Sequence, residues 1–228
     1  MKGRFFITGD IHGDVARLIL FIQRMKLKSG DKICVLGDAG ILWRNDKKDT
    51  DYIIKYWDEY SNGVELYFID GNHENFNLLN SLPVDENNMG IVSDKIHYLR
   101  RGCVYEINGK RILSCGGADS VDWHRRTEGL NWWKEETISQ EDIDRVPAGH
   151  YDYVFTHCCP LNVFDDNRVY LITLSALDQS KINHNSEQKL EDLYNKITFD
   201  NWYFGHYHID KKFDNGFRCF LYDFEEVR

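Results

Sequence analysis

The sequence predicts an α/β protein of the α+β type, in which helices cover a mixed sheet or two packed sheets. Short segments rich in Ile, Val, Phe, Tyr and Leu alternate with helical patterns in the first part of the chain, and antiparallel hairpins follow in the second part. With 228 residues, 42% of them hydrophobic, the chain is long enough to bury a core. Its 3 prolines leave little room for a flexible linker, so we expect one domain over residues 1–228.

Eight segments have the composition of β-strands, because β-branched and aromatic residues dominate them. Asn108–Gly109 separates Cys103–Ile107 from Arg111–Cys115, and Asn215–Gly216 separates Ile209–Phe213 from Phe217–Leu221. Asn-Gly tolerates the positive φ angles of a type I′ turn, so each pair predicts a hairpin. The eight segments are Arg4–Thr8, Lys32–Leu36, Val64–Ile69, Cys103–Ile107, Arg111–Cys115, Tyr153–Thr156, Asn201–Phe204 and Phe217–Phe224.

Three helices are predicted from the spacing of their apolar residues. In Val15–Leu27 such residues recur every three or four positions, and Asp14 can cap the first turn. Thr50–Tyr60 is the second helix, and the third runs from a cap at Ser186 through Ile197. The chain therefore begins β-α-β-α-β, the order that gives parallel strands.

Charge and composition exclude several classes of protein. The 28 basic and 37 acidic side chains give a net charge of −9, so we expect no binding to long duplex nucleic acid. The longest apolar run, Leu18–Ile22, is far shorter than the ~20 residues that span a bilayer, and the N-terminus lacks a signal-peptide pattern. Together with 6 cysteines that form no C-x-x-C pair, these features predict a cytoplasmic protein with reduced thiols and no membrane contact.

Polar side chains that can bind metal ions follow five of the predicted strands, in each case beside a glycine or another small residue. Ligands in open α/β sheets bind outside the carboxyl ends of the strands, so we expect these side chains to lie together. They are Asp10 and His12 in GDIHG, Asp38 in GD, Asn72 in GNHE, His157 after a later strand, and His206 and His208 in GHYH.

These oxygen and nitrogen donors number seven, more than one zinc or magnesium ion usually takes from a protein. The set suits two metal ions that share one carboxylate. Imidazole combined with carboxylate and carboxamide favours manganese, iron, zinc or cobalt over calcium. Two divalent ions with Asp10 and Asp38 would leave a charge of about +2, which explains how an acidic protein could hold a phosphate.

The order and spacing of these motifs resemble those of the calcineurin-like metallophosphoesterase superfamily, over nearly the whole chain from Asp10 to His208. GDIHG and GNHE are written here as in its phosphoprotein phosphatase branch. Gly116–Glu136 also resembles a segment of small bacterial and phage metallophosphoesterases. The resemblance implies a two-sheet mixed β-sandwich flanked by helices, with the site at the strand ends.

The resemblance also implies the cofactors and the role of each site residue. Two divalent or trivalent transition-metal ions, manganese preferred and iron or zinc as alternatives, would supply a bridging hydroxide as the nucleophile. His73 would donate a proton to the leaving group. One ion would be held by Asp10, His12 and His208, the other by Asn72, His157 and His206, with Asp38 bridging both.

The second motif departs from the phosphatase pattern GD-x-x-D-R-G. Ile41 stands where a carboxylate would orient His73, and Leu42 stands where an arginine would bind phosphate. Asp70 and Glu74 are the candidates to replace that carboxylate.

Residues 117–147 occupy the place where the family often carries a substrate-facing insertion. The segment is rich in tryptophan and arginine, which can stack on bases and bind phosphate, but such residues also pack or form surface pairs. Arg125 and Arg126 in this segment, and Arg44 after the second motif, are the candidate substrate contacts. Asp122 and Arg126, four residues apart, could instead pair along a helix.

We therefore predict a dimetal-dependent phosphoester hydrolase, specifically a phosphomonoesterase with a small phosphorylated substrate, for which a nucleotide is one candidate. A phosphodiesterase or nuclease acting on a nucleotide or an RNA end is the first alternative. A metal-bound scaffold without catalytic activity is the second. The sequence makes no prediction about the oligomeric state.

Overall fold

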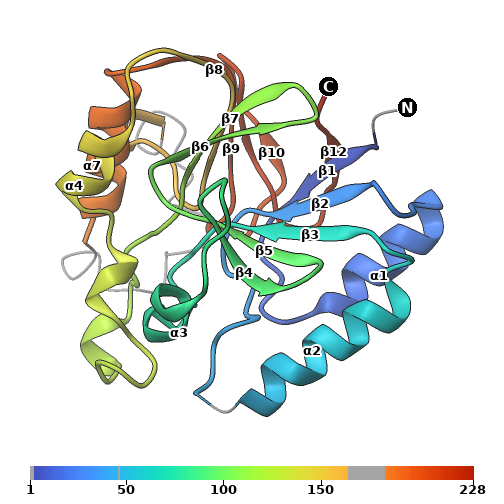
Figure 1. Ribbon diagram of the computed structural model, residues 1–228. Coiled ribbons are helices and arrows are strands. Elements are labelled where there is room, and N and C mark those ends of the chain that lie inside the picture. Colours follow the sequence, from blue (N-terminus) through green and yellow to red (C-terminus); the bar gives the residue numbers. More distant parts are fainter. Residues whose placement is uncertain (1–2, 46, 164–182) are drawn as a thin grey trace.

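The computed structural model describes residues 3–45, 47–163 and 183–228, and its strands form two sheets that pack face to face (Figure 1). The strand orders are β12-β1-β2-β3-β5-β4 and β10-β11-β9-β8-β7-β6. In each sheet four central strands run parallel and an antiparallel strand lies at either edge. The predicted mixed two-sheet architecture with flanking helices is confirmed.

Two long helices cover the outer face of the first sheet. They are α1 (Val15–Met25) and α2 (Lys47–Tyr60), and their apolar side chains pack with those of the sheet in one cluster. The indole of Trp57 is fully buried and donates a hydrogen bond to the carbonyl oxygen of Val64 at 2.9 Å, which ties α2 to the chain entering β3. The short helix α3 (Phe76–Ser81) follows β3. The strands are β1 (Phe5–Thr8), β2 (Lys32–Val35), β3 (Glu65–Phe68), β4 (Met89–Ser93), β5 (Ile96–Leu99) and β12 (Glu225–Glu226).

The second sheet carries α4 (Gln140–Arg145) and α7 (Asn185–Tyr194) on its outer face, again through one apolar cluster. Two short 3-10 turns, Trp123–Arg125 and Lys134–Glu136, lie between β7 and α4. The strands are β6 (Cys103–Ile107), β7 (Lys110–Cys115), β8 (His150–Thr156), β9 (Thr198–Phe204), β10 (Lys211–Lys212) and β11 (Phe217–Cys219).

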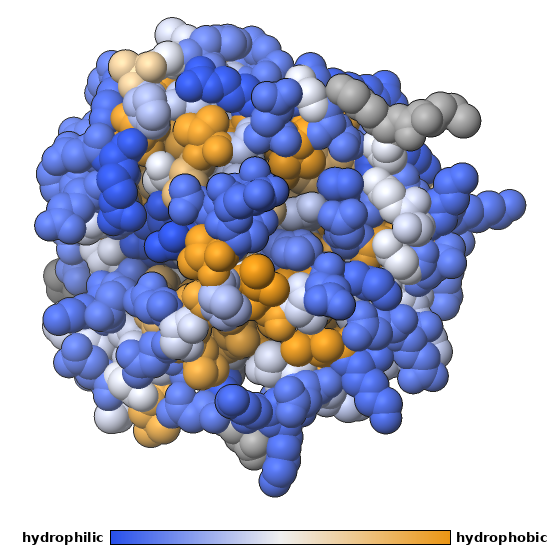
Figure 2. Space-filling view, in the orientation of Figure 1, coloured by the Kyte–Doolittle hydropathy of each residue, from blue (hydrophilic) through white to orange (hydrophobic). Residues whose placement is uncertain are grey.

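A third apolar cluster fills the space between the sheets. Side chains alternate between the two faces of a strand, so Phe5 and Ile7 of β1 enter this cluster whereas Phe6 packs under the helices. Hydrophobic residues therefore occupy consecutive positions in the central strands, as expected for strands buried on both faces. Figure 2 shows one outer face of the molecule, with apolar side chains gathered toward its middle inside a hydrophilic rim.

The first two predicted helices form with shifted ends. Asp14 caps α1 as predicted, accepting a hydrogen bond from the backbone N–H of Arg17 at 3.2 Å. The helix ends at Met25 because Lys26 adopts a left-handed conformation (φ 55°). Helix α2 begins at Lys47, three residues before the predicted start.

The predicted cap of the third helix is wrong. Helix α7 begins at Asn185, with His184 at the cap position. Ser186 lies inside the helix and is buried, and its hydroxyl accepts a hydrogen bond from the N–H of Ile138 at 3.1 Å. The hydroxyl therefore ties α7 to the segment before α4 instead of capping its own helix.

Both predicted hairpins are confirmed, with positive φ at Asn108, Gly109, Asn215 and Gly216. The predicted strand Phe217–Phe224 is too long, because pairing stops at Cys219. The carboxylate of Asp210 then accepts hydrogen bonds from the N–H groups of Leu221, Tyr222 and Asp223 and turns the chain away. The C-terminal residues cross to the other sheet and pair with β1 as β12.

All six cysteines are free thiols, in agreement with the expectation of reduced cysteines. None of the helices in the described ranges is long and apolar enough to span a membrane.

Candidate metal centre

The predicted ligands come from both sheets and meet at the carboxyl ends of the parallel strands. In the first sheet they follow β1, β2 and β3, and in the second sheet they follow β8 and β9. Two sheets that pack face to face bring these five loops to one end of the sandwich, as open α/β sheets do with their ligand sites.

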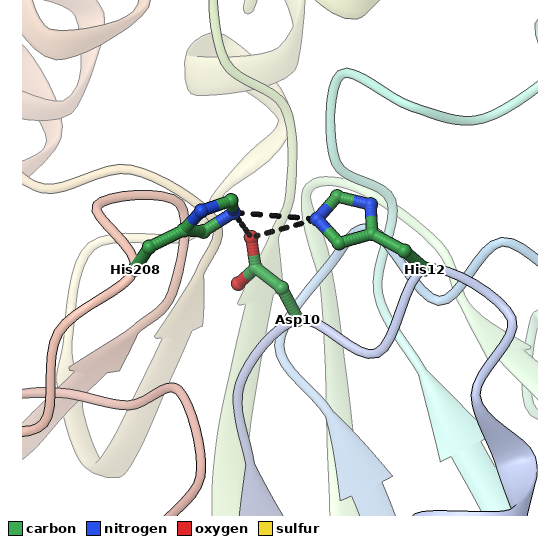
Figure 3. Close-up of side chains that lie close together, drawn as sticks. All are labelled: Asp10, His12 and His208. Atoms are coloured by element: carbon green, nitrogen blue, oxygen red, sulfur yellow. Dashed lines mark hydrogen bonds and ion pairs between the residues drawn. The ribbon is translucent and has the colours of Figure 1, made fainter. Parts of the chain in front are cut away.

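Asp10, His12 and His208 form the first group of ligand atoms, and their side chains point toward one another (Figure 3). The Oδ2 atom of Asp10 lies 3.2 Å from Nε2 of His208 and 3.9 Å from Nε2 of His12. The two Nε2 atoms are 3.3 Å apart. One carboxylate oxygen and two ring nitrogens thus face a common point, as three ligands of one metal ion would.

Asp10, Asp38 and His157 form a second, fully buried group that shares Asp10 with the first. The Oδ1 atom of Asp38 lies 3.3 Å from Nε2 of His157, and its Oδ2 atom lies 4.0 Å from Nδ1 of His12. One oxygen of Asp38 thus faces His157, and the other lies nearest the ring nitrogen of His12 that does not face Asp10 and His208. The role of Asp38 as a bridging carboxylate stays a prediction.

The two remaining predicted ligands border the buried group. The Oδ1 atom of Asn72 lies 3.3 Å from Nε2 of His157, and its amide nitrogen donates a hydrogen bond to Oγ of Ser120 at 3.1 Å. The ring of His206 lies 5.0 Å from that of His157, and its backbone N–H donates to Oδ1 of Asp10 at 2.9 Å.

The loops that carry these residues are held in unusual backbone conformations. His12, Asp38, His206 and His208 all have φ between 47° and 66°. Non-glycine residues adopt this left-handed region at a cost of order 1 kcal/mol, and such strain gathers at functional sites. Gly37 shows how closely the loops pack, because it has φ +86° and a Cβ there would lie 2.2 Å from Nδ1 of His157.

Hydrogen bonding around His157 fits a cation at its Nε2 atom. Nδ1 of His157 donates to the carbonyl oxygen of Leu36 at 2.7 Å, so in the neutral ring Nε2 carries a lone pair. That lone pair faces two more acceptors, Oδ1 of Asp38 and Oδ1 of Asn72, each at 3.3 Å. Three acceptors that face one another require either a proton or a metal ion between them.

The charges of the buried group point the same way. Burial lowers the pKa of His157, but the carboxylates of Asp38 and Asp10 outweigh that effect and raise it to about 10. Burial and the neighbouring His157 charge lower the pKa of His206 to about 3. The Oδ2 atom of Asp10 is buried, and among the described residues its near neighbours are the ring nitrogens of His208 at 3.2 Å and His12 at 3.9 Å, which are themselves predicted ligands. The residues present therefore fit a pair of metal ions.

His73 lies against this centre, and among the described residues its side chain has an arginine as its partner and not a carboxylate. Its ring centroid is 5.3 Å from that of His12 and 5.3 Å from that of Trp43, and burial lowers its pKa. Its Nε2 atom lies 3.3 Å from Nη2 of Arg126. Arginine can only donate, so Nε2 of His73 accepts this hydrogen bond.

Neither Asp70 nor Glu74 replaces the missing carboxylate, because both are used elsewhere. Asp70 accepts from the hydroxyl of Tyr98 at 2.8 Å and from Arg101 at 3.1 Å. Glu74 accepts from backbone N–H groups in two ligand loops, those of Ala39 at 2.8 Å and Gly71 at 2.9 Å. Burial and the charge of Asp38 raise the pKa of Glu74 to about 8.

Of the three predicted substrate arginines, Arg126 reaches His73. It also forms the alternative pair, with its Nε atom 2.7 Å from Oδ1 of Asp122. Arg125 is exposed and makes no ion pair with any residue in the described ranges. Arg44 is 72% exposed and pairs with Asp49 at 3.4 Å.

A cavity of about 350 Å³ has His12 among its lining residues, and Asp10, Asp38 and His157 do not line it. Its wall is apolar and aromatic, with one ion pair at the rim. It is lined in part by Ile41, Trp43, Arg44, Asp49, Tyr52 and Ile53. A volume of this size suits a small organic group.

Three residues that support the site could not be identified from the sequence. Arg17 projects from α1 and donates to the carbonyl oxygens of Gly9 at 3.2 Å and Asp10 at 2.9 Å, which fixes the first ligand loop. Ser120 and Glu136 belong to the segment 117–147 and hold Asn72 through hydrogen bonds. Ser120 and Glu136 lie in Gly116–Glu136, which resembles a segment of small bacterial and phage metallophosphoesterases. The amino-acid sequence does not show which residues of this segment point inward.

Comparison with known proteins gives two matches. The model of the calcineurin-like phosphoesterase family matches residues 3–210. The chain is also similar to the lariat debranching enzyme of Drosophila melanogaster, with 26% identity over 231 residues. The matched region covers 89% of this chain and 42% of that enzyme, so the chain spans less than half the length of the relative.

Proposed function

The chain belongs to the calcineurin-like phosphoesterase family. From this premise we propose that it is a metal-dependent phosphoester hydrolase, specifically a dimetal phosphomonoesterase acting on a small phosphorylated substrate. The observation that carries the proposal is the convergence of ligand atoms from both sheets, including two buried carboxylates, directly beside His73. With two metal ions bound, such a centre would offer positive charge where a phosphate would bind.

The ligand groups described above, which share Asp10, would hold the two ions, and we propose Asp38 as the bridging carboxylate. The mixture of ring nitrogens with carboxylate and amide oxygens favours manganese, with iron or zinc as alternatives. When bound, two such ions make hydroxide available near neutral pH and neutralise the charge of a phosphoryl group.

His73 and Arg126 would act on the two sides of the phosphate ester. The guanidinium of Arg126 can bind phosphoryl oxygens as a two-pronged donor. A phosphate that takes this hydrogen bond releases Nε2 of His73, and its negative charge favours the protonated ring. That Nε2–H can then be donated to the leaving oxygen.

The shape and charge of the protein support a small substrate. The cavity of about 350 Å³ beside His12 has room for a leaving group such as an aromatic ring, with Trp43 and Tyr52 in its wall. The net charge of −9 opposes the approach of a long duplex nucleic acid. We also propose a cytoplasmic location, supported by the free cysteine thiols.

A second candidate function is a phosphodiesterase or nuclease that acts on a nucleotide or an RNA end. Two observations favour it: the similarity to a lariat debranching enzyme, and the aromatic side chains of the segment 117–147. Trp123 is 39% exposed, and its ring lies 6.2 Å from that of Trp132. Exposed indoles of this kind can stack on bases. Trp133, in contrast, is buried and packs.

The two functions are separated by turnover of p-nitrophenyl phosphate and of its bis-ester, with manganese and after chelation. We expect metal-dependent hydrolysis that is faster on the monoester. A ratio of bis-ester to monoester activity well above one favours the second function. Absence of metal-dependent turnover on both esters and on a nucleotide panel contradicts both functions.

The variant His73→Asn tests whether the centre is catalytic or only a scaffold. We expect it to lose ~10²–10⁴ in kcat, the usual contribution of a general acid, while it still binds both metal ions. His150→Asn is the matched control, because His150 begins β8 at the opposite end of the strand from His157. Unchanged activity in His73→Asn would show that this histidine is not the acid.

A further inference from the structure

A chain of buried hydrogen bonds connects the ligand Asn72 to the segment 117–147. The amide nitrogen of Asn72 donates to Oγ of Ser120 at 3.1 Å. Oγ of Ser120 donates in turn to Oε2 of Glu136 at 3.0 Å, and the backbone N–H of Ser120 donates to Oε1 at 2.6 Å. The side chains of all three residues are almost completely buried.

The chemistry of these groups gives the chain one direction. Above a pH of about 7, the pKa of the Glu136 side chain, its carboxylate is ionised and only accepts, so the single hydroxyl proton of Ser120 is committed to Glu136. The hydroxyl oxygen then has only lone pairs to offer to Asn72, and it must be met by the amide NH₂ group. The carbonyl end of the amide, Oδ1, is thereby turned toward Nε2 of His157, 3.3 Å away.

The direction matters because the two ends of a carboxamide have nearly the same shape but opposite polarity. With Oδ1 toward His157, Asn72 presents a lone pair to a cation. Rotated by half a turn, it would present N–H groups to the cation and an oxygen to the lone pairs of Ser120, so that both ends would be repelled. Buried polar groups without a partner cost about 1–3 kcal/mol each, which is enough to select one orientation.

Glu136, at the far end of this row of hydrogen bonds, is itself anchored, so the row can hold Asn72 firmly. The backbone carbonyl of Glu136 accepts from the N–H of Ala118 at 3.1 Å and from Nη2 of Arg101 at 3.3 Å. Arg101 is itself paired with Asp70, two residues before Asn72. The segment and the ligand loop are therefore joined at two points.

We propose that Ser120 and Glu136 are positioning residues that orient the amide of Asn72 and thereby set the affinity of the metal site it shares with His157. The inference rests on the proposed function for the assignment of Asn72 as a ligand. It gives the segment 117–147 a role in holding metal, in addition to the substrate contact suggested for Arg126. Partners of metal ligands typically contribute 10- to 100-fold in metal affinity.

The test is a titration of metal-free protein with Mn²⁺, following free Mn²⁺ by its EPR signal. We expect the wild type to bind two ions, and Ser120→Ala to bind one of them ~10- to 100-fold more weakly while the other is unaffected. Ser114→Ala is the matched control, because Ser114 is also fully buried and its hydroxyl donates to the carbonyl of Leu99, outside the site.

Glu136→Gln tests the direction of the hydrogen bonds from Asn72 through Ser120 to Glu136, with almost no change in side-chain volume. A glutamine must place its NH₂ group against either the N–H or the hydroxyl of Ser120. The first placement opposes two donors, and the second forces the hydroxyl proton toward Asn72. We therefore expect the same selective loss of one Mn²⁺ ion as in Ser120→Ala. In both variants a higher Mn²⁺ concentration should restore kcat, which would not follow from general damage to the fold.

The inference is overturned if Ser120→Ala and Glu136→Gln bind both Mn²⁺ ions as tightly as the wild type and Ser114→Ala do. A wild type that binds a single ion also overturns it. The readout is metal binding and does not depend on turnover. A wild type that binds two ions but hydrolyses no ester would contradict the proposed function, and the comparison of the variants would still decide the role of Ser120 and Glu136.

Discussion

Arg126 brings a positive charge to His73 from an unexpected part of the chain. In the phosphatase pattern the residues around the catalytic histidine come from the second motif, but Ile41 and Leu42 are buried in the core here. The guanidinium of Arg126 instead reaches His73 from the segment 117–147 while it is held by Asp122. The identity of the partner changes as well, because a carboxylate would stabilise a protonated histidine and an arginine does not.

We expect Arg126→Ala to lower kcat/KM for phosphate esters by about 10- to 100-fold, because one charged, two-pronged donor to the phosphate is removed. Arg126→Lys should recover only part of this loss, since an ammonium group cannot contact Asp122 and the phosphate with the same fork. Steady-state kinetics at saturating Mn²⁺ would measure the effect. Arg125→Ala, in the same turn but exposed, should stay within about twofold of the wild type. Equal losses in the two alanine variants would contradict the role of Arg126.

Glu136 should make the stability of the metal-free protein depend on pH. Burial raises the pKa of this carboxyl to about 7, above its ordinary value of about 4.5. The folded protein then holds a proton that the unfolded chain has lost, so the free energy of unfolding should fall as pH rises from about 4.5 to about 7 and level off above that.

The size of this effect is on the order of 2–3 kcal/mol, and Glu136→Gln should abolish it because glutamine does not titrate. Urea unfolding of both proteins at several pH values would isolate it, since the other titrating groups cancel in the difference. A constant difference between the two proteins from pH 4.5 to pH 8 would be incompatible with this expectation.

The loops after the strands could be predicted better than some of the elements themselves. Asp10, Asp38 and His157 were recognisable because each follows a run of apolar residues and a sheet brings such positions together. The strands β4 and β5 and the helices α3 and α4 were not predicted, because runs of four to six residues have no clear period. The strand β12 could not be predicted, since its partner β1 lies at the other end of the chain.

The contacts of the segment 117–147 were equally hidden in the sequence. Its Asp142 forms a capping box with Ser139 at the start of α4 and also pairs with Arg101 at 3.3 Å. The pairing of Asp142 with Arg101 connects residues 41 positions apart, so no local pattern reveals it. Arg101 links β3, through Asp70, to α4 and to the carbonyl of Thr137.

We expect Arg101→Met to destabilise the protein by about 3–5 kcal/mol, because it leaves the carboxylate of Asp70 buried without its charged partner. Denaturant unfolding monitored by tryptophan fluorescence would measure the loss. Arg100→Met is the control, because Arg100 is the neighbour of Arg101 but is only half-buried. Arg100→Met should lower the free energy of unfolding by less than about 1 kcal/mol. A cost below 1 kcal/mol for Arg101→Met would mean that this ion network does not hold the segment in place.

The molecule as a whole concentrates negative charge at the point where its two sheets meet. Asp10 and Asp38 are buried side by side in a chain whose net charge is already −9, and the ligands around them adopt strained backbone conformations. Both features are unfavourable without a cation. Metal ions at this position would therefore stabilise the fold as well as the reaction, because they bind loops that belong to both sheets.

We expect Mn²⁺ at about a hundredfold above its Kd to add about 2.7 kcal/mol per ion to the free energy of unfolding. For a chain of 228 residues, each bound ion should therefore raise Tm by about 5–10 °C, and a chelator should reverse the rise. Differential scanning calorimetry would measure the shift. Ca²⁺ should produce a smaller one, because imidazole is a poor ligand for it. Asp38→Asn keeps a residue type that tolerates positive φ but removes the shared charge, and it should lose most of the response to Mn²⁺. A shift of the same size in Asp38→Asn, or with Ca²⁺, would mean that Mn²⁺ acts on the acidic surface and not at the centre between the sheets.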